Sequence, residues 1–248
     1  MICYYITDRR QFAGDAREQW RRLLAKIAEA ARAGIDYIQL RERDLMPQEL
    51  EILAQEAVET IRQVYAGDAA NHLSNASPKK RRTRLLINSR VDIALAAGAD
   101  GVHLRSGDLA ASEARVIWDR AATKGKPGMA KEPFLVAVSC HTLAELRSAE
   151  SHGADFSVFA PVFEKVTFPQ AQGIGLQALR KACSQGFRPA NLEGVGAGHM
   201  PVLALGGVTM DNAAACLEAG AAGIAAIRLF QDHDVAETLS ELRELRVR

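Results

Sequence analysis

The stretch ALAAGADGVHLR at residues 94–105 decides the fold, because it reads as an alanine-rich helix end, a glycine and a short apolar run. The same phrase recurs as AARAGIDYIQLR at 30–41, SAESHGADFSVFAP at 148–161 and CLEAGAAGIAAIR at 216–228. Each copy predicts a helix that ends on a glycine in a left-handed conformation and leads into a buried strand. These glycines are Gly34, Gly98, Gly153 and Gly220.

The spacing of these glycines indicates further strands. Counted from one glycine to the next, the intervals are 64, 55 and 67 residues, room for two strand–helix units each. Each interval therefore holds one more strand, at 85–87, 134–138 and 202–205, and residues 2–6 supply the first. Helical periodicity at 20–33, 47–64 and 143–152 alternates with these strands. In a chain of 248 residues, this alternation predicts a single (β/α)₈ (TIM) barrel spanning residues 1–248.

One stretch departs from this pattern. Residues 66–84, AGDAANHLSNASPKKRRTR, have no apolar period and end in a basic cluster. The stretch joins the second helix to the third strand, which places it on the amino-terminal face, away from the expected site. We predict a mobile insertion, with the KKRR run at 79–82 as a solvated loop rather than a polyanion site. A second loop, 187–200, has the same interpretation.

Charge and cysteine content limit the partners. The chain carries 31 basic and 30 acidic residues, so it has no general attraction for nucleic acid or anionic membranes. We find no basic leader before an apolar segment and no apolar run that could span a bilayer, so we expect a cytoplasmic protein. Both a monomer and a homo-oligomer remain open. The cysteines lack metal-site spacing and are expected to be reduced structural thiols: Cys3, Cys140, Cys183 and Cys216.

The candidate site follows from the fold, because catalytic residues of such barrels lie at the carboxyl ends of the strands. The side chains at these ends are polar and strongly basic, which predicts an anionic ligand such as phosphate or pyrophosphate. Alternatively, some of the arginines pair with Glu42, Asp44, Asp92 or Glu164. The candidates are Gln39, Arg41, Arg43, Asn88, Arg105, Asp108, Ser139, His141, Lys165, Thr167, Gly206, Gly207 and Arg228.

Two sets of these candidates have specific chemistry, one for phosphate binding and one for proton transfer. Gly206 and Gly207 follow the seventh strand and Arg228 ends the eighth, the usual place of a phosphate cradle, although a tight turn explains two glycines equally well. His141 can shuttle a proton near neutral pH, although a lone histidine is more often structural. His103 and His152 are interpreted as structural. Cys140 should point away from Ser139 and His141 while the chain is extended.

Six phrases of the sequence resemble the thiamine-phosphate synthase superfamily, whose other branch is the thiazole tautomerase (TenI-like) group. The similarity covers nearly the whole chain. The phrases are YYITD at 4–8, IQLRERD at 38–44, LLINSRVDIALAAGADGVHLRSGDL at 85–109, VSCHT at 138–142, GADFSVFAPVF at 153–163 and PVLALGGVTMDN at 201–212.

The resemblance implies a thiamine-biosynthetic transferase. Such a synthase couples hydroxymethylpyrimidine diphosphate to a thiazole phosphate, loses pyrophosphate through a pyrimidine-centred cation and needs Mg²⁺. It further implies that Asp108 is one of two magnesium-binding aspartates and that Gly207 lies in the thiazole-phosphate cradle. The other carried-over positions are Gln39, Arg41 and Asn88 for the pyrimidine substrate, and Ser139 and Thr167 for its diphosphate.

The sequence departs from the synthase pattern within the site. Ser89 stands where the synthase has its other magnesium aspartate, and Arg43 replaces the usual lysine. Lys165-Val166-Thr167-Phe168 replaces a Thr-x-Thr-Lys run, so Lys165 and Arg105 are candidates to restore positive charge. Two alternatives stay open. One is a tautomerase that moves a proton with His141 and needs no metal, and the other is a non-catalytic protein that binds thiamine intermediates.

Overall fold

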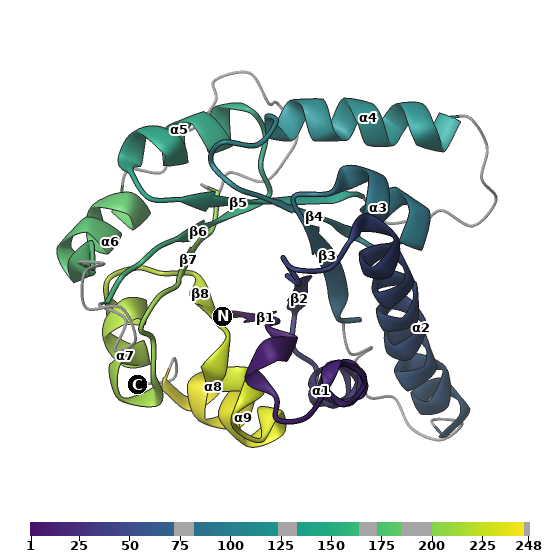
Figure 1. Cartoon of the computed structure of the whole chain (residues 1–248). Helices are drawn as coiled ribbons and strands as arrows, with labels where there is room; N and C mark the ends of the chain where they lie inside the picture. Colours follow the sequence, from purple (N-terminus) through teal and green to yellow (C-terminus); the bar gives the residue numbers. More distant parts are fainter. Residues whose placement is uncertain (72–81, 124–132, 164–172, 185–199, 246–248) are drawn as a thin grey trace.

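The computed structural model describes residues 1–71, 82–123, 133–163, 173–184 and 200–245. Its sheet is a closed parallel barrel in which each strand pairs with the next and β8 returns to pair with β1, which confirms the predicted (β/α)₈ fold (Figure 1). The strands are β1 (Ile2–Ile6), β2 (Tyr37–Leu40), β3 (Arg84–Asn88), β4 (Gly101–Leu104), β5 (Leu135–Cys140), β6 (Phe156–Phe159), β7 (Val202–Ala204) and β8 (Gly223–Ala226).

The helices surround the barrel on its outside (Figure 1). Asp15 caps α1 by accepting a hydrogen bond from the backbone amide of Glu18. The four predicted glycines all have positive φ, between 67° and 97°, as a left-handed helix end requires. The helical elements are η1 (Arg9–Gln11), α1 (Ala16–Ala33), α2 (Pro47–Asn71), α3 (Val91–Ala97), α4 (Ala111–Thr123), α5 (Leu143–Ser151), α6 (Gly175–Ser184), α7 (Met210–Glu218), α8 (Arg228–Gln231) and α9 (Val235–Leu245).

Helix α2 is longer than the sequence pattern indicates. It continues through Asn71, so the first six residues of the stretch 66–84 are helical, and β3 already begins at Arg84. Alanines at 66, 69 and 70 are good helix formers, and they sustain the helix after its apolar face ends. Residues 72–81 of the predicted insertion, and 187–199 of the second predicted loop, lie outside the described residues.

The strands divide the core into two clusters by their alternation. One set of side chains packs against the helices, for example Ile38, Val102 and Cys140. The residues that alternate with these along the strands point the other way and fill the barrel interior, where Tyr4 and Phe156, for example, are buried against one another. Successive residues of a strand point to opposite faces, so the residue number decides which side chains line the barrel.

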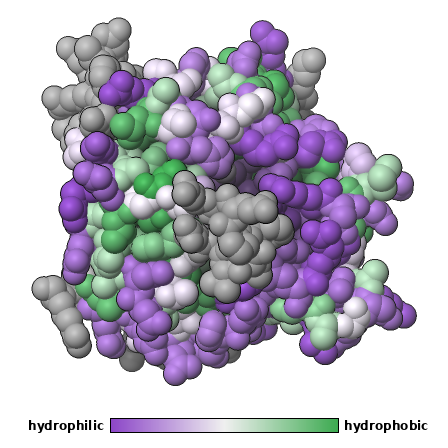
Figure 2. Space-filling model, turned by 60° about the vertical axis from the view of Figure 1, so that its left-hand side comes forward, coloured by the Kyte–Doolittle hydropathy of each residue, from purple (hydrophilic) through white to green (hydrophobic). Residues whose placement is uncertain are grey.

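The face of the molecule drawn in Figure 2 is largely hydrophilic, with smaller hydrophobic patches between the polar residues. None of the helices in the described ranges combines the length and the apolarity that crossing a membrane requires.

Candidate active site

Four neighbouring strands each direct a polar side chain into the barrel near its carboxyl end. Strand alternation shows that these side chains face the interior. Each of them lies two positions after a residue of the interior cluster, or between two residues that pack against the helices. Gln39 and His103 are buried, whereas Asn88 and Ser139 are partly exposed. Register places Asn88 opposite His103. The interior therefore changes from apolar to polar at the end where the site was predicted.

A row of hydrogen bonds joins the ends of β2, β3 and β4. Gln39 Nε2 donates to Asn88 Oδ1 at 2.8 Å, and Asn88 Nδ2 donates to Ser89 Oγ at 3.3 Å. Ser89 Oγ then donates to Asp108 Oδ2 at 2.6 Å. Ser89 has φ 59°, a left-handed conformation that is uncommon outside glycine. Three of the predicted site residues are thus brought together, with Ser89 as the link between them.

Asp108 forms an ion pair with Arg105 across the turn that follows β4. Its Oδ1 accepts from Arg105 Nη2 at 2.9 Å and its Oδ2 from the Arg105 backbone amide at 2.8 Å. Burial raises the pKa of the Asp108 carboxyl, but the hydrogen bonds from Arg105 and Ser89 outweigh burial and hold this pKa below its ordinary value. The carboxylate is therefore ionised near neutral pH, and Arg105 is 62% exposed beside it.

Of the acidic residues that were candidate partners of the strand-end arginines, two pair with Arg9 instead, whereas Asp92 pairs with the strand-end Arg90, as the alternative expects. Arg9 forms ion pairs with Glu42 at 3.2 Å and with Asp44 at 2.7 Å. Arg90 pairs with Asp92 at 2.5 Å, and Glu164 lies outside the described residues. Within the described ranges, no carboxylate lies within ion-pair distance of the following arginines: Arg41, Arg43 and Arg228.

These unpaired arginines place positive charge beside the mouth of the barrel. Burial and the neighbouring charge of Arg43 lower the pKa of Arg41, whose ordinary value is so high that the guanidinium stays charged. The partly buried guanidinium of Arg41, which has no carboxylate partner among the described residues, favours an anionic ligand. The sequence analysis did not identify Arg9 as the ion-pair partner of Glu42 and Asp44, because Arg9 begins a 3₁₀ helix after β1 and lies outside the phrases that were recognised.

The two glycines after β7 differ in what surrounds them. Gly206 is buried with φ 98°, and a Cβ there would lie 2.7 Å from the Cα and Cβ of Pro161. Gly206 therefore allows the loops after β6 and β7 to approach each other. Gly207, with φ 63°, is exposed, and its carbonyl accepts from Asn212 Nδ2 at 2.9 Å. Gly207 is the glycine that can face a ligand.

Arg228 opens the short helix α8 directly after β8 and is exposed. This helix is fastened to the end of β1, because Gln231 Nε2 donates to the carbonyl of Asp8 at 2.9 Å and Gln231 Oε1 accepts from Tyr5 at 2.9 Å. Since β7 and β8 are neighbours, Arg228 and Gly207 follow adjacent strands. This arrangement is the usual one for a phosphate site in a (β/α)₈ barrel.

His141 and Cys140 separate as the alternation of β5 predicts. The strand extends to Cys140, so His141 follows it directly, and its Nδ1 lies 2.7 Å from the carbonyl oxygen of Ala160. That oxygen can only accept, so Nδ1 donates and Nε2 is the basic nitrogen of the neutral ring. Cys140 is buried in the helix-facing core, and burial raises its thiol pKa to about 12, which argues against a nucleophile.

Lys165 and Thr167 lie outside the described residues, so their predicted roles remain predictions. No cluster of three or more histidine, cysteine or acidic side chains that could hold a metal exists in the described ranges. Asp108 is therefore not part of such a cluster among the described residues. Any metal at this position would need further oxygen ligands from its substrate or from water.

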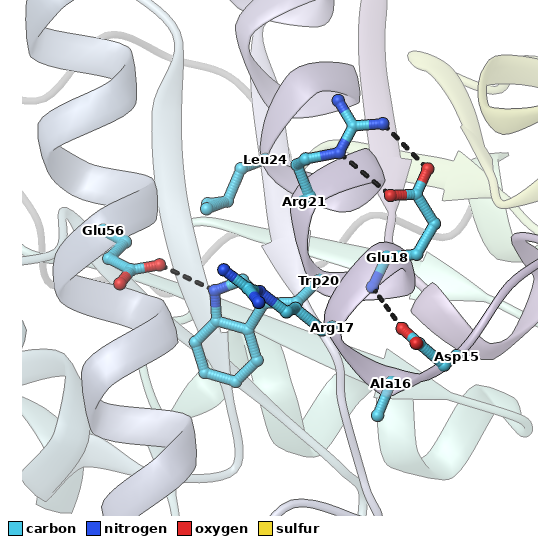
Figure 3. Close-up of a pocket in the computed structure, with 8 residues that line it drawn as sticks. All are labelled: Asp15, Ala16, Arg17, Glu18, Trp20, Arg21, Leu24 and Glu56. Carbon is cyan, nitrogen blue, oxygen red and sulfur yellow. Dashed lines mark hydrogen bonds and ion pairs between the residues drawn. The ribbon is translucent and has the colours of Figure 1, made fainter.

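A surface cavity of about 870 Å³ lies between α1 and α2, outside the barrel (Figure 3). Trp20 Nε1 donates to Glu56 Oε2 there at 2.6 Å, and Arg21 pairs with Glu18. A smaller cavity of about 160 Å³ lies behind the turn after β4 and includes Arg105 and Asp108. None of the predicted site residues lines the larger cavity, so this cavity is not the candidate active site.

The barrel and the polar residues at its carboxyl end define an enzyme of the (β/α)₈ class. Residues 3–230 match the family described as thiamine monophosphate synthase. The chain belongs to this family.

Relatives support this placement over most of the chain. A thiamine-phosphate synthase of Caldanaerobacter subterraneus is 32% identical over 246 residues, covering 98% of this chain and 92% of the relative. A thiamine-phosphate synthase of Methanoregula boonei is 32% identical over 223 residues, covering 89% and 84%. The solved structure of a thiamine phosphate pyrophosphorylase from Pyrococcus furiosus is similar with a TM-score of 0.69 and 26% identity, covering 98% of this chain and 94% of that one.

Proposed function

We propose that this protein is a thiamine-phosphate synthase that couples hydroxymethylpyrimidine diphosphate to a thiazole phosphate with release of pyrophosphate. The observation that carries the proposal is the hydrogen-bonded row from Gln39 through Asn88 and Ser89 to Asp108. In the family these positions hold the pyrimidine and one magnesium ion. Both substrates are phosphorylated small molecules, which suits a mouth with unpaired arginines.

The pyrimidine would bind at Gln39 and Asn88. Their amides are already oriented by the 2.8 Å bond between them, so Gln39 Oε1 is left to accept from an amino group of the ring. Because Gln39 is almost wholly buried, a ligand that donates to its Oε1 would complete the hydrogen bonding of this amide. Arg41 and Arg43 would attract the diphosphate and hold the substrate at the strand ends.

The diphosphate would lie towards Asp108, Ser139 and Arg105. Asp108 fits a magnesium ion whose other ligands come from diphosphate and water, since Mg²⁺ is often held by one or two carboxylates and substrate phosphates. When bound, this ion would neutralise charge on the departing pyrophosphate. Arg105 must release at least one oxygen of Asp108 for the ion to bind, and its exposure allows that movement. Lys165 and Thr167 are proposed to contact the diphosphate as well.

The thiazole phosphate would bind at Gly207 and Arg228. Their positions after adjacent strands supply a backbone turn and a guanidinium for one phosphate group. Gly206 would shape this loop rather than touch the ligand. We also propose that the protein is one domain that acts in the cytoplasm, which its four free cysteines support.

The deciding experiment offers the purified protein both substrates with magnesium, and in a separate reaction the thiazole tautomer alone. Thiamine phosphate and pyrophosphate formed in equal amounts are the expected result. Tautomerisation without coupling would replace the proposal by a tautomerase, and ligand binding without either turnover would replace it by a binding protein.

A further inference from the structure

A chain of hydrogen bonds crosses the barrel interior from β1 to β5. The Tyr4 hydroxyl lies 3.0 Å from His103 Nδ1, and His103 Nε2 lies 2.7 Å from Ser139 Oγ. Tyr4 is fully buried and His103 is 2% exposed, whereas Ser139 is partly exposed at the mouth. These hydrogen bonds thus connect the apolar interior to Ser139, a residue of the proposed diphosphate site.

Tyr4 determines the direction of these hydrogen bonds. Burial raises the pKa of its hydroxyl well above the ordinary value, so the hydroxyl keeps its proton. His103 Nδ1 is its one hydrogen-bond partner among the residues described by the structure. Because a buried donor without an acceptor is costly, Tyr4 donates to Nδ1. In the neutral ring Nδ1 therefore carries no proton, and Nε2 donates its own to Ser139 Oγ.

The imidazole also stays neutral. Burial, and then the nearby charge of Arg41, lower the pKa of His103 to about 3. A neutral ring with its proton on Nε2 cannot take the proton of Ser139, so this pair is not a nucleophile and base of the hydrolase type. Ser139 accepts from the ring instead. Its own O–H has no acceptor in the described part of the chain and is left to donate to a ligand.

We propose that His103 is a positioning residue: it orients the Ser139 hydroxyl so that this hydroxyl donates to an oxygen of the pyrimidine diphosphate. This inference rests on the proposed function, because it assigns the acceptor to that substrate. A hydroxyl held from behind by a fixed N–H donor presents its proton to the anion before binding. Tyr4 is the second positioning residue, since it selects the tautomer of His103.

The tautomer can be tested in the wild-type protein without any substrate. A two-bond ¹H–¹⁵N correlation spectrum of histidine-labelled protein, with Tyr4→Phe as comparison, distinguishes a protonated from an unprotonated ring nitrogen. The expected result is a protonated Nε2 and an unprotonated Nδ1 for His103 in the wild type. A proton on Nδ1 would overturn the proposal, whatever reaction the protein catalyses.

A double-mutant cycle tests the functional part. Ser139→Ala should lower kcat about 10²-fold, the usual effect of removing one fixed donor to a developing anion. His103→Asn, too short to reach Ser139, should cause a smaller loss, and His103→Gln, which can still donate to it, should recover part of that loss. In the His103→Asn/Ser139→Ala double variant the loss should equal that of Ser139→Ala alone.

Binding of inorganic pyrophosphate supplies a readout besides turnover. With magnesium present, calorimetry should show the same non-additive pattern in dissociation constants, and circular dichroism confirms that each variant is folded. Additive losses in the double variant would overturn the positioning role while leaving the synthase proposal intact. A wild type that couples no substrates would overturn the synthase proposal, and the tautomer spectrum would still decide the hydrogen-bond direction.

Discussion

Ser89 donates a 2.6 Å hydrogen bond to the carboxylate of Asp108, so a neutral side chain stands beside the proposed magnesium ligand. We predict that Ser89→Asp lowers the magnesium concentration for half-maximal turnover roughly tenfold, because a second carboxylate strengthens an oxygen site. Aspartate tolerates the φ of 59° at this position better than most residues. Ser89→Asn is the control of similar shape without charge, and an equal magnesium response in both variants would remove Ser89 from the metal site.

Replacement of Asp108 tests the metal ligand itself. Asp108→Ala should abolish magnesium-dependent turnover, because it removes the one carboxylate in the row. The measurement is a magnesium titration of the coupling rate, with and without a chelator. Asp92→Asn, whose carboxylate pairs with Arg90, is the control and should respond to magnesium as the wild type does. Wild-type turnover of Asp108→Ala in the presence of chelator would rule out metal assistance at this site.

The two glycines after β7 should respond differently to alanine. Gly206→Ala places a methyl group against the backbone of Pro161 at φ 98°, so we expect a loss of about 2–4 kcal/mol in the free energy of unfolding. Gly207→Ala should cost only about 1 kcal/mol, the usual penalty of a left-handed residue, while weakening thiazole-phosphate binding. Urea unfolding and calorimetry measure the two effects. Equal stability of both variants would contradict the assigned roles.

The ion pair of Arg9 and Glu42 should be important for stability, because the two side chains are only 7% and 1% exposed. Arg9→Met leaves the Glu42 charge buried without its partner, and breaking a buried pair in this way typically costs about 3–5 kcal/mol. Urea unfolding at pH 7 measures the loss. Arg21→Met, which removes an exposed partner of Glu18, is the control and should leave the unfolding midpoint near that of the wild type.

Arg9 also makes the free energy of unfolding depend on pH, through its hydrogen bonds to Asp44. Its hydrogen bonds to Asp44 hold the pKa of that carboxyl below the ordinary value. The resulting stabilisation is present above the unfolded-state pKa of about 4 and is lost as the pH falls through the lower folded-state pKa. The stability difference between wild type and Arg9→Met should therefore narrow in acid. A difference that stays constant from pH 6 to pH 3 would contradict this coupling.

His141 carries the alternative proton-transfer chemistry. Asn can still donate to the Ala160 carbonyl as Nδ1 does, but it lacks the basic Nε2. If the wild type interconverts the thiazole tautomers, His141→Asn should lower kcat for that reaction about 10²–10⁴-fold and leave KM nearly unchanged. Stopped-flow or NMR assays measure the interconversion. Full activity in the folded variant would make His141 a structural residue that holds the loop after β6.

The repeated glycine phrases were sufficient to predict the barrel, because a helix end, a left-handed glycine and a buried strand are all local features. The pairing of Arg9 with Glu42 was not predictable, since it joins side chains 33 residues apart that only the closed barrel brings together. The end of β5 was misplaced by two residues, because Ser139 and Cys140 continue the strand with a polar residue facing inward.

His103 was interpreted as structural, and its burial agrees with that interpretation. Its hydrogen bond to Ser139 joins two strands and could not be read from either one. The sequence did, however, contain a signal for the inward orientation of His103. Val102 and Leu104 are apolar neighbours that pack towards the helices, so strand alternation alone turns His103 into the barrel. Sequence reasoning thus found the ends of the strands but not the residues just inside them.

The polar layer formed by Gln39, Asn88, His103 and Ser139 has a thermodynamic consequence for binding. These side chains stand on β-strands that the barrel itself fixes, and all four are joined in pairs, Gln39 with Asn88 and His103 with Ser139, by hydrogen bonds of 2.8 Å or less. A ligand that docks here does not have to order them, so little side-chain entropy is lost on association. We therefore expect mutations in this layer to change the enthalpy of binding more than its entropy.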